Sequence, residues 1–269
     1  MAGTLFVVAT PIGNLDDITL RALKVLRDVS VIAAEDTRRT AHLLARHAIA
    51  TSTTSLHEHN EARKSASLIA RLEHGEDVAV VSDAGTPTIS DPGGRLIRDA
   101  IAAGIRVEPI PGASAVLAAL SAAGLATDEF AFLGFPPVRS KDRKRWFQRV
   151  RCVPGAAVFF EAPHRIRTTL STLMETVGDR PVVVARELTK LHEELVRGPI
   201  SAVLARIGQP RGEYTVVIEI GYKTENEQVD IGVMTNEVPS SRRETISAIA
   251  RELGLSANEV YSALETLKK

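Results

Sequence analysis

Short apolar runs alternate with amphipathic stretches along the first half of the chain. The runs typical of strands cover residues 4–9, 29–34, 78–81 and 106–110. Stretches with helical spacing of apolar positions follow them, at residues 20–26, 40–46, 62–74, 95–103 and 113–123. This alternation is typical of βαβ units. It predicts a parallel-sheet α/β domain over residues 1–123.

The pattern changes in the second half, where strand-like runs follow one another more often. They cover residues 130–135, 157–161, 181–186, 192–197 and 214–220, with helical spacing at residues 165–177 and 200–207. We therefore expect a second α/β domain with a mixed sheet over residues 124–222. Residues 223–240 are polar, contain Pro239 and show no sustained apolar period, which indicates a linker.

The last part of the chain, residues 241–269, predicts two short helices. Apolar positions at helical spacing precede the turn Gly254-Leu255-Ser256, and Ser256 is a suitable N-cap for the second helix. This arrangement resembles a helix-turn-helix, which suggests nucleic-acid contact. The alternative is a helical hairpin that packs on the body or on a partner chain. We favour packing, because the second helix carries Asn258 and Glu259 and few basic residues.

Charge and cysteine content narrow the classes of function. Lys plus Arg and Asp plus Glu both number 33, so the formal net charge is zero. A binding site for a polyanion must then be a local patch. One cysteine, Cys152, excludes an internal disulfide framework and fits a reducing compartment. No leader pattern and no long apolar run is present, so we expect a soluble, cytoplasmic protein.

The segment of residues 80–94 carries the most chemistry. A strand apolar on both faces leads into a loop of small residues, and Asp91-Pro92 predicts an N-cap followed by the first helical position. Ala84 and Gly85 leave room for a ligand to approach the backbone, and Asp83 offers a carboxylate at the carboxyl end of the strand. The alternative is a tight loop that only connects two elements.

Five motifs, taken together, resemble a known family. They are residues 10–19 (TPIGNLDDIT), 35–38 (EDTR), 81–87 (VSDAGTP), 111–114 (PGAS) and 160–165 (FEAPHR). In this order they resemble the bacterial 16S rRNA ribose 2′-O-methyltransferases that modify a cytidine of the decoding region, within the tetrapyrrole-methylase fold family. The resemblance covers about residues 3–222, and more loosely the final helices, which match a C-terminal helix-turn-helix appendage.

The resemblance implies S-adenosylmethionine as methyl donor, bound in a cleft between two α/β domains, and a homodimer. The residues that it assigns to the donor are Pro11, Asp83, Ala84, Thr86, Ala113, Ser114, Glu161, Ala162, Pro163, Ala185, Glu213 and Thr215. Pro11 suits a stiff crossover after the first strand, whereas Ser114 fits an N-cap equally well. A dinucleotide fold is disfavoured, because G-x-G-x-x-G is absent after the first strand.

Methyl transfer to a hydroxyl needs a group that accepts the hydroxyl proton. Three carboxylates in the matching motifs, Asp17, Glu35 and Asp36, are candidates for this base. Each has an alternative role, since Asp16-Asp17 precede one predicted helix and Glu35-Asp36 precede another, where acidic residues cap. Arg165 is suited to hold phosphate.

A basic segment, residues 139–151, is the best candidate for RNA contact. Its cations crowd around Trp146 and Phe147, a composition that favours phosphate binding with salt-sensitive affinity. The alternative is a solvated helix face above core aromatics. The residues that we assign to RNA are Arg38, Arg39, Asn60, Arg139, Lys141, Arg143, Lys144, Arg145 and Arg165. We predict no metal site, because His57 and His59 lack further ligands at suitable spacing.

Two rival functions remain open at this point. The first is a tetrapyrrole methyltransferase of the same fold, in which the basic segment, residues 139–151, would have no role in substrate binding. A non-enzymatic nucleic-acid binder would use only the final helices and leave the ligand loops without a role. Binding of the methyl donor discriminates an enzyme from a binder, and the acceptor that is methylated discriminates the two enzymes.

Overall fold

The computed structural model describes residues 2–57, 59–208 and 211–221, and the single positions 246, 258 and 260. The chain divides into two compact units, Met1–Tyr222 and Lys223–Lys269. The predicted linker, residues 223–240, lies outside the described residues, as does most of the predicted helix-turn-helix-like segment. Within that segment Ile246, Asn258 and Val260 are helical, and Ile246 and Val260 are buried.

The first sheet is parallel, as the βαβ pattern predicts. Its strands are β1 (Thr4–Val8), β2 (Val31–Ala34), β3 (Thr53–Ser55), β4 (Val78–Val81) and β5 (Arg106–Ile110), in the order β3-β2-β4-β1-β5. All four residues of β4 are buried, as expected of a central strand that is covered on both faces. The sequence did not predict β3, whose three polar residues are only half-buried.

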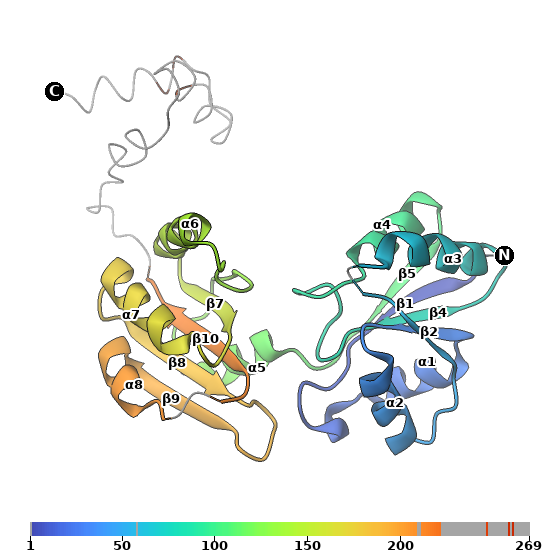
Figure 1. Cartoon of the computed structure of the whole chain (residues 1–269), viewed down its shortest axis with the longest axis horizontal. Helices are drawn as coiled ribbons and strands as arrows, with labels where there is room; N and C mark the ends of the chain where they lie inside the picture. The colour runs from blue at the N-terminus through green and yellow to red at the C-terminus, as the bar shows by residue number, and fades with distance from the viewer. Residues whose placement is uncertain are drawn as a thin grey trace. The chain divides into compact units, whose positions relative to one another are not determined.

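Helices cover both faces of this sheet (Figure 1). On one face, α1 (Leu20–Asp28) and α2 (Thr37–Arg46) bury Leu26 and Leu44 against strand residues such as Ile32. On the other face, α3 (Glu61–Glu73) and α4 (Gly94–Ala102) bury their own apolar stripes against Leu5 and Val80. Each helix thus covers the sheet with one apolar side and faces solvent with the other.

The strand order creates a crevice at the carboxyl ends of β1 and β4. These strands are neighbours, but β1 continues through α1 on one face and β4 continues through α4 on the other. The two loops therefore diverge, and open α/β sheets bind ligands at such a switch point.

The second sheet is mixed, which agrees with the pattern of residues 124–222. Its strands are β6 (Phe130–Phe132), β7 (Ala156–Glu161), β8 (Pro181–Arg186), β9 (Glu194–Pro199) and β10 (Tyr214–Glu219), in the order β6-β7-β10-β8-β9. The β6–β7 pair is parallel, and the pairs that β10 forms with β7 and β8, and β8 with β9, are antiparallel. The helices α6 (Ser140–Arg151), α7 (Ile166–Val177) and α8 (Ile200–Arg206) share one core with this sheet.

The opposite face of the second sheet is covered by α5 (Ala115–Ala123). Val116 and Leu120 of this helix pack in one cluster with Val158 and Val217 of β7 and β10. Packing therefore groups α5 with the second sheet, although the chain pattern grouped it with the first. We accordingly propose a domain boundary before α5, between Ile110 and Ser114, in place of residue 123.

One predicted helix start is wrong. Asp91-Pro92 does not begin a helix, because α4 starts at Gly94 after Gly93, whose φ is 108°. Glu61 of α3 accepts hydrogen bonds from the backbone N–H groups of Gly93 and Arg95 at 3.1 and 2.8 Å, so the cap comes from another helix.

The start predicted for α1, at Leu20, is confirmed, but the cap is not an acidic residue. Its N-cap is Thr19, whose hydroxyl accepts from the N–H of Ala22, while Asp16 and Asp17 lie in a separate 3-10 turn, Leu15–Asp17. Capping, which was the alternative role of Asp36 and of Ser114, is confirmed, since each side chain accepts a hydrogen bond from the first turn of its helix.

Within the described part of the chain, none of the helices combines the length and the apolar character that crossing a lipid bilayer requires. In the same part of the chain, His, Cys, Asp and Glu side chains form no group of three or more arranged for a metal ion.

Candidate functional site

A pocket of about 590 Å³ opens at the crevice of the first sheet. The loops that follow β1, β2 and β4 form one side, and two residues of the second sheet's loops complete it. The lining residues are Thr10, Pro11, Ile12, Gly13, Leu15, Asp36, Arg38, Arg39, Thr40, His42, Leu43, Ser82, Asp83, Ala84, Lys190 and Glu213. Its volume lies in the range of small-molecule and cofactor sites.

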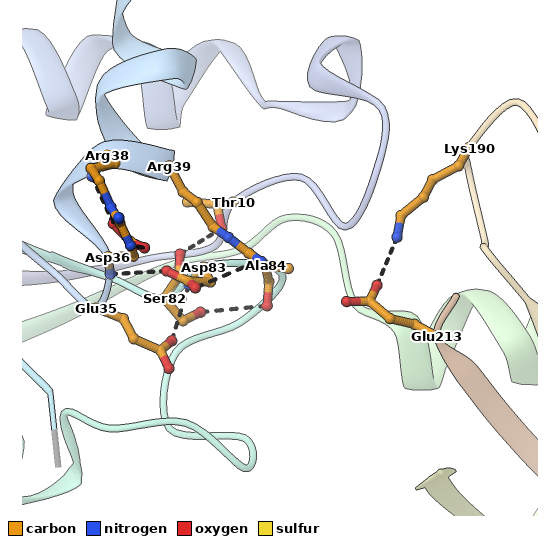
Figure 2. Close-up of polar contacts among 10 residues, drawn as sticks. All are labelled: Thr10, Glu35, Asp36, Arg38, Arg39, Ser82, Asp83, Ala84, Lys190 and Glu213. Carbon is orange, nitrogen blue, oxygen red and sulfur yellow. Dashed lines mark hydrogen bonds and ion pairs between the residues drawn. The ribbon is translucent and has the colours of Figure 1, made fainter. Parts of the chain in front are cut away.

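The loops after β1 and β4 are tied to each other by backbone pairing. The N–H of Thr10 donates to the carbonyl of Gly85 at 2.9 Å, and the N–H of Gly85 donates back at 3.0 Å. The Thr10 hydroxyl also donates to the carbonyl of Ser82 at 3.2 Å (Figure 2). Gly85 has a φ of 82°, so glycine is the residue that this turn accommodates without strain.

Asp83 ties the loop after β4 to the loop after β2. One carboxylate oxygen accepts from the N–H of Asp36 at 2.9 Å, and the other lies 3.5 Å from a guanidinium nitrogen of Arg39 (Figure 2). The N–H of Asp83 donates to the Glu35 carboxylate at 3.2 Å. The aspartate predicted to face a ligand is therefore also the residue that fixes the geometry of the pocket floor.

Asp36 is an ionised N-cap rather than a free carboxylate. It accepts from the N–H of Arg38 and is paired with the Arg38 guanidinium at 2.8 Å. The side-chain hydrogen bond from Arg38 lowers the pKa of Asp36 to about 2. A group held so firmly in its charged form is a poor proton acceptor.

Glu35 and Asp91 have the opposite electrostatic environment. Burial raises the pKa of Glu35, although the hydrogen bond from the N–H of Asp83 partly offsets this effect. Burial, followed by the charge of Glu35, raises the pKa of Asp91 to about 6, although a hydrogen bond with Ser82 lowers it. Sequence reasoning missed Asp91 as a candidate base, because an aspartate before a proline matched the pattern of an N-cap.

The second sheet approaches the first through the segment that links β8 and β9. The N–H of Asn14 donates to the Thr189 hydroxyl at 3.0 Å. A Cβ at Gly13 would lie 2.5 Å from Cγ of Lys190, so this approach requires glycine. Lys190 then pairs with Glu213 at 2.8 Å, and both residues line the pocket. Sequence reasoning missed Lys190, which lies in no recognisable motif.

The residues predicted to bind the donor fall into three groups. Those that line the pocket are Pro11, Asp83, Ala84 and Glu213. Thr86, Ala113 and Ser114 lie beside the crevice, where the Thr86 hydroxyl donates to the Ala113 carbonyl at 3.4 Å and Ser114 caps α5. The third group belongs to the second sheet, with Ala185 and Thr215 paired on β8 and β10, and with Ala162 and Pro163 after β7.

Glu161 faces the other side of the second sheet. Its side chain is fully buried and lies 3.4 Å from Nε of Arg165. It also accepts from the N–H of Ala162 at 2.8 Å and from the hydroxyl of Thr169 in α7. All of these partners belong to the protein, so the Glu161 carboxylate is not available to a ligand in this structure. Neighbouring residues of a strand face opposite sides of the sheet, which separates Glu161 from Phe160.

The predicted RNA residues are also divided. Arg38 and Arg39 line the pocket. Trp146 and Phe147 are core residues of α6, whereas the cations at its start and along it are exposed, namely Arg139, Lys141, Lys144 and Arg145. The alternative interpretation, a solvated basic face above core aromatics, is therefore confirmed, and RNA contact by these cations stays a prediction.

Arg143 and Arg165 contact the protein rather than solvent. Arg143 donates to the Thr169 hydroxyl at 2.7 Å, and burial together with the nearby Arg165 lowers its pKa. Arg165 donates to the carbonyl oxygens of Pro136 and Pro137 at 2.6 and 3.3 Å. Both side chains therefore serve the packing of the second sheet in this structure.

Two further predicted residues lie away from the pocket. Asn60 is occupied within its own loop, where it accepts from the N–H of His57 and donates to the Ser55 carbonyl. Asp17 is exposed in the 3-10 turn and does not line the pocket. Neither residue lines the pocket in this structure, and the roles that the motifs suggested for them stay predictions.

Comparison with known proteins identifies the family of this fold. A profile of the family described as Tetrapyrrole (Corrin/Porphyrin) Methylases matches residues 4–204. The chain belongs to the tetrapyrrole methylase family. A solved structure of uroporphyrin-III C-methyltransferase from Thermus thermophilus, complexed with S-adenyl homocysteine, has the same fold. Its TM-score is 0.58 at 18% identity, over 81% of this chain and 98% of that chain.

Two curated relatives of this tetrapyrrole methylase are much more similar in sequence. The protein from Pseudomonas aeruginosa is 48% identical over 236 residues, which cover 86% of this chain and 83% of the relative. The protein from Escherichia coli O157:H7 is 41% identical, and the matched region covers 98% of this chain and 95% of the relative. Both are named ribosomal RNA small subunit methyltransferase I. The fold and the family expected from the five motifs are therefore confirmed.

Proposed function

We propose that this protein transfers the methyl group of S-adenosylmethionine to the ribose 2′-hydroxyl of a cytidine in the decoding region of 16S rRNA. The observation that carries the proposal is the identity of 48% and 41% with relatives named ribosomal RNA small subunit methyltransferase I, over most of both chains. The pocket and the basic face of α6 support it, because they provide a small-molecule site and a phosphate-binding surface in one protein.

The residues of the pocket fit a zwitterionic donor. Asp83 and Glu213 supply negative charge for its cationic groups, while Arg39 and Lys190 supply positive charge for its carboxylate. The glycine at position 13 keeps the opening clear of a side chain at the point where both sheets meet. When bound, S-adenosylmethionine supplies a methyl group on a positively charged sulfur. On transfer, the sulfur–methyl bond breaks and the sulfur becomes a neutral thioether.

The protein itself then has two tasks. It must align the attacking oxygen with the methyl carbon. The loops after β1 and β4 contribute to this alignment, because their backbone pairing holds the wall of the donor pocket rigid. It must also accept the hydroxyl proton as the new oxygen–carbon bond forms. We assign this second task to the pair Glu35 and Asp91, whose pKa values are raised by burial, in preference to Asp36, whose pKa is lowered. Neither residue lines the pocket itself, but Glu35 accepts from the N–H of Asp83 and Asp91 is hydrogen-bonded to Ser82, and both of these partners line it.

The RNA is held by two sets of cations in our proposal. Arg38 and Arg39 lie at the pocket, where they can contact phosphates next to the target ribose. Lys141, Arg145 and Arg149 follow one another at every fourth position of α6, all exposed, and form a stripe suited to phosphates farther away. We also propose that the protein acts in the cytoplasm as a homodimer and without a metal ion.

The substrate class is tested by transfer of labelled methyl groups from S-adenosylmethionine. The acceptors are 30S subunits from cells that lack this protein, naked 16S rRNA, and uroporphyrinogen III. We expect label in the RNA of one or both ribosomal samples and none in the tetrapyrrole. Label in uroporphyrinogen III alone would overturn the proposal in favour of a tetrapyrrole methyltransferase.

The position of the methyl group on the nucleotide requires a second readout. Alkaline cleavage of RNA uses the 2′-hydroxyl as nucleophile, so a methylated 2′-oxygen protects the adjoining phosphodiester. We expect the label to be recovered in an alkali-resistant dinucleotide that begins with cytidine. Recovery in a single nucleotide would show methylation of a base and would contradict the assignment to ribose.

A further inference from the structure

An exposed aromatic cluster lies at the carboxyl ends of β6 and β7. Phe135 is 53% exposed. Its ring lies 5.4 Å from that of Phe160, which in turn lies 4.9 Å from Phe132 in an edge-to-face arrangement. An aromatic ring gains free energy by burial, so one that remains exposed on a supported surface is a candidate contact for a ligand.

The loop that carries Phe135, residues 133–139, is fixed at several points. The N–H of Leu133 donates to the Val158 carbonyl at 2.8 Å, and the Gly134 carbonyl accepts from the N–H of Phe160 at 2.9 Å. The indole of Trp146 donates to the Leu133 carbonyl at 3.1 Å. The exposure of Phe135 is therefore a property of a well-anchored loop, and a preorganised surface loses little entropy when it binds.

The rest of this loop is anchored by Arg165. Its guanidinium donates to the carbonyls of Pro136 and Pro137, and its Nε lies 3.4 Å from the buried carboxylate of Glu161. The side chain of Arg165 is 17% exposed, which leaves it little access to an RNA phosphate. The sequence assigned Glu161 to the methyl donor and Arg165 to phosphate. In this structure, the ion pair between the two side chains supports the loop.

The surroundings of Phe135 favour RNA as the occupant. The loop continues into Arg139 and the exposed cations of α6, so an aromatic surface and a phosphate-binding surface are adjacent in the chain. A Cβ at Gly134 would lie 3.5 Å from the hydroxyl of Ser90, which places the loop beside the segment that carries Asp91. An aromatic platform next to cations is the usual means of holding an unstacked base.

We propose that Phe135, backed by Phe160, is the stacking platform for an unpaired nucleobase of the RNA substrate, and that the Glu161–Arg165 ion pair positions the loop that presents it. This inference rests on the proposed function and adds a residue that orients the acceptor. Stacking on Phe135 would hold the base at the edge of the crevice, with the ribose of the same nucleotide facing the carboxylates of Glu35 and Asp91. No contact between Phe135 and the methyl donor is required.

The test uses the full-length protein, 30S subunits from cells that lack it, and S-adenosylhomocysteine as the donor-site probe. We expect Phe135→Ala to lower kcat/KM for 30S methylation by about 10- to 100-fold, as the loss of one base stack implies. Phe135→Leu should show a similar loss, whereas Phe135→Trp should retain activity. The affinity for S-adenosylhomocysteine, measured by calorimetry, should stay within about twofold.

Val138→Ala is the matched control, because Val138 is 83% exposed in the same loop and has no ring. It should leave kcat/KM unchanged. Unchanged RNA methylation by Phe135→Ala would overturn the platform. An equal loss of affinity for S-adenosylhomocysteine would overturn it as well, by showing that the ring contacts the donor. If light scattering shows a dimer for wild type and a monomer for Phe135→Ala, the ring packs against a second copy, and this result would overturn the platform too.

The positioning role is tested by Arg165→Lys, which keeps the charge but loses the fork that reaches both proline carbonyls. We expect it to raise the KM for 30S subunits more than it lowers kcat. Its effect should not add to that of Phe135→Ala, because both changes remove the same platform. Additive effects would assign Arg165 a separate role. A wild-type protein that methylates no RNA would overturn the proposed function and the platform together.

Discussion

At the scale of single residues, carboxylates that are adjacent in the fold have different protonation behaviour. Asp36 is held in its charged form by Arg38, whereas burial raises the pKa of Glu35 and brings that of Asp91 to about 6. Asp83 serves as a connector between their loops. The protein thus separates a structural carboxylate, whose pKa is lowered, from two carboxylates whose pKa values are raised.

The raised pKa of Asp91 predicts how Asp91→Asn changes stability with pH. Burial disfavours the ionised carboxylate in the folded state, so its cost to folding grows as the pH rises from the ordinary value of 3.8 to the folded value of about 6, and is complete above that. Asp91→Asn removes this cost. The substitution should therefore raise the Tm more at pH 8 than at pH 4, as measured by calorimetry. A lower Tm for the variant than for wild type at pH 8 would contradict a buried, disfavoured charge.

The same residue predicts the acid limb of the pH profile. A base with a pKa of about 6 is lost as the pH falls through that value, so kcat for RNA methylation should decline below about pH 6. Asp91→Asn should lower kcat at pH 8 and remove the decline. A wild-type profile that is flat between about pH 5 and 8 would exclude Asp91 as the acceptor.

The connecting role of Asp83 gives a graded prediction for donor binding. Asp83→Ala removes the acceptor for the N–H of Asp36 and the partner of Arg39, and should weaken S-adenosylhomocysteine binding about tenfold. Asp83→Asn keeps one acceptor oxygen and should lose less. Calorimetry checks the order of the two variants, and equal affinity for wild type and Asp83→Ala would rule out this role.

At the scale of elements, α6 combines a core side and a basic side. Trp146, Phe147 and Val150 pack in the core of the second sheet, while the cations Lys141, Arg145 and Arg149 lie in solvent. Arg143 is half-buried and contacts Thr169, so it belongs to the packing of α6 on α7. The sequence offered the division into a basic side and a core side as an alternative. It did not separate Arg143 from the exposed cations, because its partner Thr169 lies 26 positions away.

Charge reversal on the exposed side of α6 tests its role in RNA binding. Replacing Lys141, Arg145 and Arg149 by Glu should weaken 30S binding and make the dependence of log K on log salt shallower, by about 0.7–0.9 for each phosphate that the variant no longer neutralises. Donor affinity should be unchanged. The matched control reverses three exposed cations on helices of the first sheet, Lys24, Arg63 and Arg98. Equal salt dependence in both triple variants would remove α6 from the interface.

The ends of the helices and strands show which structural features can be predicted from the residues of one short segment. The order of residues predicted the burial of β4 and offered the cap at Asp36 as an alternative, because both depend on residues within one short segment. The start of α4 was not, because its cap is Glu61 of another helix. The missed strand β3 has three polar residues and gains its place only by pairing with β2.

At the scale of the whole molecule, the order of the strands determines where the pocket forms. The loops after β1 and β4 diverge at the switch point, and segments around Asn14 and Thr189 connect the two sheets across the pocket. The motifs predicted the loops on the first sheet. They did not predict Lys190, and they assigned Glu161 to the donor although its side chain faces α7, because such placement follows from packing between distant segments.

In our proposal, this protein methylates a ribose of 16S rRNA in the cell. The most direct measurement maps alkali-resistant positions in 16S rRNA from cells with and without the protein, complemented by wild type or by Asp83→Ala. We predict that one 2′-O-methylated cytidine of the decoding region is lost without the protein, restored by wild type, and restored less fully by Asp83→Ala. A 16S rRNA with the same methylated riboses in the presence and absence of the protein would rule out this function.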